Sequence, residues 1–242
     1  MFWNEDESPQ APAIPDDILD VRFEIDCRRI PVDHAHALAS ALRAALPWVA
    51  DEPDFAPHSI HVAGSQNGWE RPEHGRDSVL LVSRRTRLVI RVPKTRVERL
   101  LAELPGARLD LGDHALTVGR GAIRPLSRET TVFARYLTFA DAADAADAPD
   151  EADPDAGLDE SAFLETAARA LAEMDIRMRK ALCGRTASIF TPEGPLRVRS
   201  LLLAGLTPDE SLRLQQRGLG TRRLWGCGIF IPHKGIAPVK PE

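Results

Sequence analysis

Glycines and arginines near the end of the chain form the pattern with the clearest chemical potential. Two Gly-x-Gly pairs lie within residues 218–228, with Arg222 and Arg223 between them. Because glycine lacks a Cβ atom, such a loop can adopt positive φ, and its successive N–H groups then form a concave anion site. Arginines add planar donors suited to phosphate. We therefore predict a phosphate-binding loop, and assign to it Arg217, Gly218, Gly220, Arg222, Arg223, Gly226 and Gly228.

The loop differs from the familiar phosphate-binding motifs. No Gly-Lys-Ser/Thr follows it, so it is not a P-loop. Its glycine spacing does not match a dinucleotide-binding motif, and the apolar run 229–231 predicts a strand where that motif has a helix. The alternative is a glycine-rich hairpin turn without a ligand, and the pattern alone leaves both interpretations open.

Composition bounds the class of protein. The chain has 242 residues, of which 43% are hydrophobic, enough for one large domain or two of ordinary size. No apolar run approaches the roughly 20 residues of a membrane span, and the acidic N-terminus lacks a signal-peptide core. The scattered Cys27, Cys183 and Cys227 form no CxxC pair, so we expect a reducing, cytoplasmic environment and no structural zinc.

Charge is unevenly distributed along the chain. The formal net charge is −5, but residues 1–20 and 141–160 contain acids and no base, which leaves the remainder basic. A basic folded part that ends in a glycine loop suits a polyanionic partner. The alternative is that acidic segments only keep a mildly basic domain in solution.

The pattern of the first half predicts alternating strands and helices. Residues 1–17 are acidic and interrupted by prolines, and we expect them to be disordered. The alternation at 19–27 predicts a half-buried strand, and the Ala/Leu-rich stretch 34–46 predicts an amphipathic helix capped by Asp33. Further predicted elements are strands at 59–63, 79–82 and 87–92 with a turn at 83–86, a helix at 94–104, and a hairpin from 107–111 to 115–118.

The second half repeats this order. We predict strands at 131–139, 185–190, 196–204 and 229–231, a helix from Asp159 or Ser161, and a helix from Thr207. Both halves are therefore β-α-β-β-α-β, which predicts an α+β fold of two tandem ferredoxin-like (RRM-type) units. The predicted organisation is an acidic tail at 1–18, a first unit at 19–128, and a second unit at 129–236 with an acidic insert at 141–158.

Several segments carry a resemblance to a known family. Two such units with the loop L-Q-Q-R-G-L-G-T-R-R-L-W-G-C-G-I-F resemble the RAMP superfamily of CRISPR-associated proteins, and within it the repeat-cleaving endoribonucleases, the sixth Cas family. Within this family, the chain resembles the Myxococcus-type branch in four segments: I-P-V-D-H-A-H-A-L-A-S-A-L, I-H-V-A-G, L-D-L-G and L-T-P-D-E-S-L-R-L-Q. The resemblance spans about residues 19–233, and the acidic insert and tail depart from it.

The resemblance implies an activity and partners. Such enzymes bind a short hairpin in CRISPR repeat RNA and cut at its base without metal or another cofactor. A 2′-hydroxyl attacks the adjacent phosphate, which leaves a 2′,3′-cyclic phosphate and a 5′-hydroxyl. The enzyme usually stays on the hairpin as part of an effector complex, so further effector-complex subunits are implied partners.

The resemblance also points to histidines at the start of the first helix. The chemistry needs a base, an acid and positive charge at the phosphate, and histidine can serve either proton-transfer role near neutral pH. His34 and His36 both lie there, about 200° apart on a helix. We prefer His34, which falls in the D-H-x-x-A-L pattern, with His36 second; either could be an ordinary exposed histidine.

Other residues have weaker assignments. His61, on a predicted strand, is more consistent with the core than with catalysis. Lys234 beside His233 is assigned to RNA binding, although solvation of the tail would explain it equally well. Trp225 could stack on a base, but packing beneath the loop is the preferred role. A turn carrying Arg84, Arg85 and Arg87 could contact the hairpin groove or be only solvated.

Three functions remain open at this point. The first is an active endoribonuclease, which the histidine pair favours. The second is a subunit that holds repeat RNA or a finished guide in an effector or transposon-linked complex with little or no turnover. The third is a scaffolding subunit without cleavage, against which the histidine-bearing helix argues.

Overall fold

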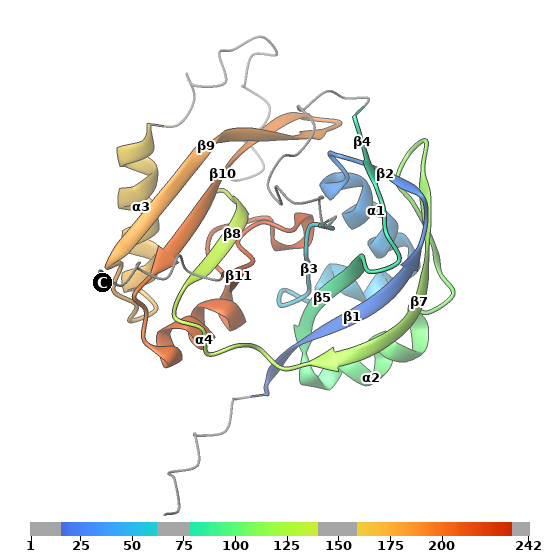
Figure 1. The fold of residues 1–242 in the computed structure, drawn as a ribbon, viewed down its shortest axis with the longest axis horizontal. Helices are drawn as coiled ribbons and strands as arrows, with labels where there is room; N and C mark the ends of the chain where they lie inside the picture. The colour runs from blue at the N-terminus through green and yellow to red at the C-terminus, as the bar shows by residue number, and fades with distance from the viewer. Residues whose placement is uncertain (1–15, 62–77, 140–158, 234–242) are drawn as a thin grey trace, which may run out of the picture.

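The computed structural model describes residues 16–61, 78–139 and 159–233, arranged as two α+β units side by side (Figure 1). The first unit has a five-stranded antiparallel sheet in the order β3-β5-β1-β7-β6. Its elements are β1 (Ile18–Asp26), α1 (Ala35–Ala45), β3 (Ala56–Pro57), β5 (Arg87–Pro93), α2 (Lys94–Glu103), β6 (Arg108–Asp110) and β7 (Ala115–Arg124).

The second unit has a four-stranded antiparallel sheet in the order β11-β8-β10-β9. Its elements are β8 (Val132–Leu137), α3 (Glu160–Ala172), β9 (Lys180–Thr191), β10 (Gly194–Ala204), α4 (Pro208–Arg217) and β11 (Ile231–Pro232). In both sheets the last strand of the β-α-β-β-α-β order lies beside the first strand of that order, and the third strand separates the first from the second. This arrangement confirms the predicted α+β fold and is that of ferredoxin-like units.

Alternation along the strands decides which face of each sheet is buried. In β1, Val21 and Phe23 are fully buried in the core of the first unit, whereas Arg22 and Glu24 face the other way and are exposed. A strand with one buried face produces this alternation of apolar and polar residues. The face that carries Arg22 is therefore free to line a ligand site.

A small third cluster of apolar residues joins the two units. Ala35 of α1 packs there with residues of the second sheet and of the glycine loop, namely Tyr136, Ile189, Leu196, Val198 and Cys227. The segment between α4 and β11 lies between the two units in the middle of Figure 1. This packing brings the start of α1 next to the glycine loop.

The strand predicted at 59–63 is wrong within the described residues. The chain instead forms the short strand β3 at residues 56–57, paired with β5, and residues 59–61 form no strand. The reason is that the N–H of Ile60 donates to the Nε2 atom of His34, at 3.0 Å, and so is not available to a neighbouring strand. Residues 62 and 63 lie outside the described residues.

The hairpin predicted around residues 83–86 is also wrong. Strand β4 (Val79–Leu81) does not pair with β5 but with β2 (Arg29–Pro31), a strand that the sequence did not predict, in a separate two-stranded sheet. Strand β5 pairs instead with β1 and β3. Hydrogen bonds between Ser83 and Thr86 hold the intervening turn, so the two strands leave it toward different partners.

Further boundaries differ from the prediction, among them the end of β7, which is Arg124 instead of residue 118. Strand β9 begins at Lys180, five residues before the predicted start at 185. The prediction stopped at Gly184 because glycine is unfavourable inside a strand. The last strand is β11 at 231–232, while Ile229 and Phe230 are buried at the end of the loop. A short 3-10 helix, η1 (Pro47–Asp51), follows α1.

Some predictions lie outside the described residues. These are most of the acidic tail, the whole of the acidic insert at 141–158, and Lys234. The exact domain boundaries remain a prediction. None of the helices within the described ranges is long and apolar enough to cross a membrane.

Helix α4 begins with a capping box. The hydroxyl of Thr207 accepts a hydrogen bond from the N–H of Glu210, and the Glu210 carboxylate accepts one from the N–H of Thr207. A hydrogen bond from Arg179, at 2.6 Å, is the main reason that the pKa of Glu210 falls to about 2. This cap fixes the first turn of the helix that leads into the glycine loop.

The Glu210 cap gives a pH-dependent prediction. Because its pKa is lower in the folded chain, the carboxylate stabilises the fold above an ordinary glutamate pKa of about 4.3, and this contribution is lost as pH falls toward about 2. We expect Glu210→Gln to lower the free energy of unfolding at pH 7 by about 1–3 kcal/mol. Urea unfolding at pH 7 and near pH 2 measures this, and an equal deficit at both pH values would contradict it.

Candidate RNA-cleavage site

The glycine loop is closed on itself and docked onto the end of β8. Gly228 has φ +68°, and a Cβ atom there would lie 1.9 Å from the Leu219 carbonyl oxygen. Gly220 has φ +74°, and its Cβ would lie 2.2 Å from the Thr138 carbonyl oxygen. Only glycine permits both the positive φ and this close backbone approach. Glycine is therefore required at these two positions by close contacts between backbone segments, within the loop at Gly228 and with the end of β8 at Gly220.

The N–H groups of three glycines are already used within the chain. Gly218 donates to Leu214, Gly226 to Arg223 and Gly228 to Tyr136, at 2.7–2.9 Å. These three N–H groups are therefore not available to an anion in this conformation. The structure gives these glycines a role in shaping the loop, in contrast to the backbone anion site that the pattern suggested.

The loop presents Arg222 and Trp225 to the start of α1. Arg222 has the left-handed φ of 60°, unusual for a residue other than glycine, and its guanidinium lies 4.8 Å from the centre of the Trp225 ring. The Trp225 ring in turn contacts His36 edge-on, with ring centroids 5.2 Å apart. All three side chains are half-buried and so remain partly accessible. The structure thus brings His36 and Arg222 together around one tryptophan.

Two acidic residues that the sequence did not assign to the site lie near this cluster in the chain or in space. Glu193 lies at the turn between β9 and β10, and hydrogen bonds from its own N–H and from Thr191, together with the charges of His36 and Arg222, lower its pKa. Asp33 does not cap α1 as predicted, because the residue at the cap position is His34. Asp33 instead accepts a hydrogen bond from the N–H of Phe190, at 2.6 Å, and so ties the start of α1 to β9. Only the tertiary structure places this turn beside α1.

His34 is placed differently from His36. It is buried, with 1% of its surface exposed, just before the first residue of α1. Its Nε2 atom accepts a hydrogen bond from Ile60, so Nδ1 carries the proton and donates to the Pro31 carbonyl oxygen, at 2.9 Å. Both ring nitrogens are therefore engaged with the backbone, and in this conformation neither is available to a ligand.

Arg223 turns away from Arg222. Its guanidinium donates to the carbonyl oxygens of Gln216 and Arg217, at the end of α4. Burial lowers its pKa to about 10. It therefore satisfies carbonyls that the helix end leaves without a partner and supports the loop from behind. Arg217 is exposed on the last turn of α4.

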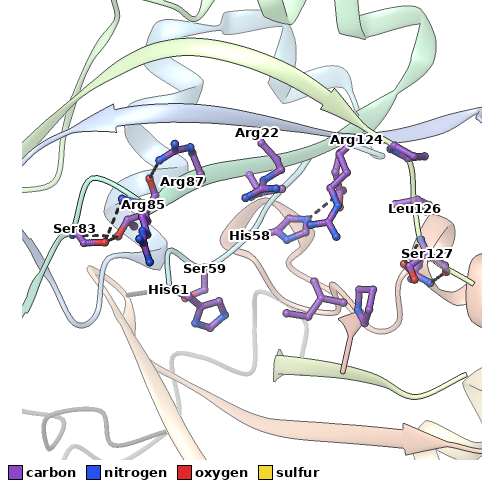
Figure 2. A pocket seen from close by; sticks show the side chains of 17 residues that line it. Arg22, His58, Ser59, His61, Ser83, Arg85, Arg87, Arg124, Leu126 and Ser127 are labelled. Carbon is purple, nitrogen blue, oxygen red and sulfur yellow. Dashed lines mark hydrogen bonds and ion pairs between the residues drawn. The ribbon is translucent and has the colours of Figure 1, made fainter. Parts of the chain in front are cut away.

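A separate basic pocket of about 320 Å³ lies between the units (Figure 2). Arg22, Arg87 and Arg124 of the first sheet line it, together with Arg85 of the turn before β5. No acidic side chain of the described residues lies within ion-pair distance of any of these four arginines. The other side of the pocket includes Ile231 of β11. Arg22 and Arg124 were not singled out in the sequence; the outward position of Arg22 in the alternation of β1 was the only signal.

His58 and His61 also line this pocket, whereas His36 does not. His58 faces the Asp20 carboxylate, at 3.3 Å, and burial lowers its pKa. Contrary to the prediction, His61 is an exposed residue outside any strand. Among the described residues, no three His, Cys, Asp or Glu side chains lie close enough together to hold a metal ion.

Comparison with known families decides the identity of the chain. The family described as Cas6 Crispr matches residues 19–235. The chain belongs to the Cas6 family. A Cas6 relative from Myxococcus xanthus (strain DK1622), named CRISPR-associated endonuclease Cas6, is 30% identical over 222 residues, which cover 92% of this chain and 84% of the relative.

Solved structures agree with this placement. One named CRISPR associated protein Cas6 has a TM-score of 0.61 at 17% identity and covers 90% of this chain and 100% of its own. Another, titled an RAMP protein binding different RNA substrates, has a TM-score of 0.57 at 10% identity and covers 89% and 100%. At these identities the likeness supports the fold. The resemblance to the Cas6 family that the sequence motifs indicated is confirmed.

Proposed function

We propose that this Cas6 chain is an endoribonuclease that binds the hairpin of CRISPR repeat RNA and cuts the precursor at the hairpin base without metal. The observation that carries the proposal is the contact of His36 and Arg222 around Trp225. A titratable imidazole and a cation at one partly accessible point are what cleavage of a phosphodiester by its own 2′-hydroxyl requires.

The chemistry at this point is a transesterification. The 2′ oxygen forms a bond to phosphorus while the bond from phosphorus to the 5′ oxygen breaks. The 2′-hydroxyl loses its proton and the 5′ oxygen gains one, which gives a 2′,3′-cyclic phosphate and a 5′-hydroxyl. We assign one of these two proton transfers to His36. Arg222 stabilises the negative charge that grows on the phosphorus oxygens.

The charge of the surrounding surface supports an RNA substrate. None of the four pocket arginines forms an ion pair with an acid among the described residues, and the one acidic residue that lines the pocket, Asp20, binds Arg91 instead. Such a pocket suits phosphate groups along a strand. We propose that the hairpin remains bound after cleavage and that the chain then serves as a subunit of the effector complex, in contact with other subunits.

The second candidate function is a subunit that binds repeat RNA with little or no turnover. The engagement of His34 favours it, because one histidine, His36, is left at the described cluster to serve two proton transfers. Under this alternative, the loop and arginines hold the RNA and His36 only packs against Trp225.

One experiment separates these functions. The purified chain is incubated with its own CRISPR repeat RNA in excess EDTA, and with the same RNA carrying a 2′-deoxy nucleotide before the cut. We expect one cut in EDTA and none in the deoxy RNA. Tight binding without a cut would support the non-catalytic subunit, whereas a cut that needs added metal or survives the deoxy substitution would exclude the proposed mechanism.

The two adjacent loop arginines provide a matched pair of variants. Arg222→Ala removes a phosphate contact, so we expect hairpin affinity to fall about threefold to tenfold and the slope of log affinity against log salt to weaken by about one. Arg223→Ala removes donors to two helix carbonyls, so we expect the free energy of unfolding to fall by about 1–3 kcal/mol.

Filter binding over a salt series and urea unfolding distinguish the two effects. If Arg223→Ala changed only the salt dependence while Arg222→Ala changed only stability, the assignment of the two arginines would have to be exchanged.

A further inference from the structure

Arg91 is a buried cation that the proposed chemistry does not use. It lies on β5 in the first unit, its exposed fraction is 0%, and it is the largest fully buried side chain of the described residues. A guanidinium taken out of water is tolerated only where its N–H groups find acceptors. The acceptors that bind the Arg91 guanidinium therefore indicate which segments of the chain it connects.

One edge of the Arg91 guanidinium binds a carboxylate of its own unit. Its Nε and Nη2 atoms donate to the two carboxylate oxygens of Asp20 on β1, at 2.8 and 3.1 Å. Burial alone would raise the pKa of Asp20, but the charges of Arg91 and His58 lower it far below its ordinary value. Asp20 therefore stays ionised and holds the guanidinium in one orientation.

The other edge reaches into the second unit. The Nη1 atom of Arg91 donates to the carbonyl oxygens of Gln215 and Phe230, at 2.8 and 2.9 Å. Gln215 lies in the last turn of α4, three residues before the first loop glycine, Gly218, and Phe230 lies two residues after the last one, Gly228. One side chain thus holds both ends of the loop against the first sheet.

The segment that connects the two units is also bound to Gln215. The side chain of Gln215 donates to the Ser127 carbonyl oxygen, at 2.6 Å, and accepts from the Ser127 N–H, at 3.3 Å. We call the group Asp20, Arg91, Gln215 and Phe230 the loop anchor. Its contacts connect β1, β5, the connecting segment and both ends of the loop in one buried network.

We propose that Arg91 is a positioning residue for RNA cleavage, and the proposal rests on the function proposed above. His36 belongs to α1 of the first unit, whereas Arg222 belongs to the loop of the second unit, so the distance between them depends on how the loop is fixed to the first sheet. The loop anchor fixes it. A misplacement of about 1 Å can reduce a reaction rate about 100-fold.

Lysine cannot replace arginine in this role. An ammonium group presents three donors from one point, whereas the guanidinium binds a carboxylate along one edge and two carbonyls along another. In Arg91→Lys the charge opposite Asp20 is retained, but at least one end of the loop loses its donor. The variant therefore tests geometry with the charge kept constant.

The test compares Arg91→Lys with a matched control, Arg199→Lys. Arg199 is also buried, at 7% exposure, but its Nη1 donates to Gly184 and Cys183 within the hairpin of β9 and β10. With enzyme in saturating excess over repeat RNA, and at a temperature where both variants are folded, we expect the single-turnover rate of Arg91→Lys to fall about 100-fold with hairpin Kd within about threefold. The control should cleave within about twofold of the unchanged chain.

Hydrogen exchange gives a readout that does not depend on catalysis. The N–H groups of Leu219 and Gly228 are hydrogen-bonded across the closed loop and to β8. We expect peptides covering 218–230 to exchange at least about tenfold faster in Arg91→Lys and at the unchanged rate in Arg199→Lys. If the unchanged chain did not cleave RNA, faster exchange would still support the loop anchor, and only the proposed function would fail.

Three results would overturn the positioning role. These are an unchanged rate in folded Arg91→Lys, an equal fall of rate in the control, and a fall in RNA affinity that accounts for the whole loss of rate. Should Arg91→Lys fail to fold, Asp20→Asn serves instead, because it weakens the grip on the guanidinium and leaves both carbonyl contacts. For Asp20→Asn we expect smaller changes in the same direction, and unchanged rate and exchange would overturn the proposal.

Discussion

His36→Ala should reduce single-turnover cleavage of repeat RNA about 1,000-fold while the hairpin Kd stays within about threefold. The reason is that a positioned acid or base contributes to the transition state and little to binding of the ground state. His36 is the histidine that the structure leaves partly accessible beside Arg222 and Trp225. Rates at saturating enzyme over a pH series measure the effect, and the variant should lose one limb of the pH profile.

His34→Gln is the matched variant at the start of the same helix. His34 bonds to Pro31 and Ile60, so we expect its replacement to lower the free energy of unfolding by about 1–3 kcal/mol and to affect cleavage less than His36→Ala does. A glutamine amide can donate and accept, which preserves part of this network. The opposite ranking, with His36→Ala active and folded His34→Gln inactive, would return the catalytic role to His34.

Gly228→Ala should unfold the glycine loop and abolish cleavage. An alanine Cβ at this position would lie 1.9 Å from the Leu219 carbonyl oxygen, and a φ of +68° is itself unfavourable for alanine. Because the obstructing atom is backbone, it cannot move aside without opening the contact between Leu219 and Gly228. We expect the free energy of unfolding to fall by at least about 3 kcal/mol.

Gly112→Ala is the control for backbone conformation alone. Gly112 has φ +84°, but nothing lies within 4 Å of a Cβ built there. It should lose only the cost of a left-handed residue, about 1–2 kcal/mol, and retain full cleavage when folded. Thermal unfolding and single-turnover rates measure both variants. Equal losses of stability, or a Gly228→Ala chain that still cleaves RNA, would show that the close approach of the two loop segments is not required.

Much of the fold follows from the sequence. The alternation in β1 and the spacing of leucines in α1 predicted both elements closely, because each reflects the burial of one face. Strand β2 and the true partner of β4 were missed, since pairing of short strands depends on distant segments. The strand predicted at 59–63 failed because a side chain, His34, binds the N–H that the strand would have used.

The sequence also determined the residue types at the candidate site. The loop and the first helix carry motifs that resembled the Cas6 family, and this resemblance is confirmed. The phosphate-directed chemistry of their arginines and histidines stays a prediction. What the sequence left open was which of these groups face a ligand. His34 and His36 are two residues apart, so a periodic pattern cannot tell which ring points to the loop and which to the backbone.

Only the tertiary structure shows that both ring nitrogens of His34 bind the backbone while the ring of His36 contacts Trp225, and it also creates the remaining features. Glu193 reaches His36 because a hairpin of the second unit packs on α1 of the first, and Arg91 meets Gln215 and Phe230 from more than 120 positions away in the chain. Local periodicity reports how strongly a residue is buried. It does not report which distant backbone group a buried side chain will bind, and the proposed positioning of Arg222 relative to His36 depends on such contacts.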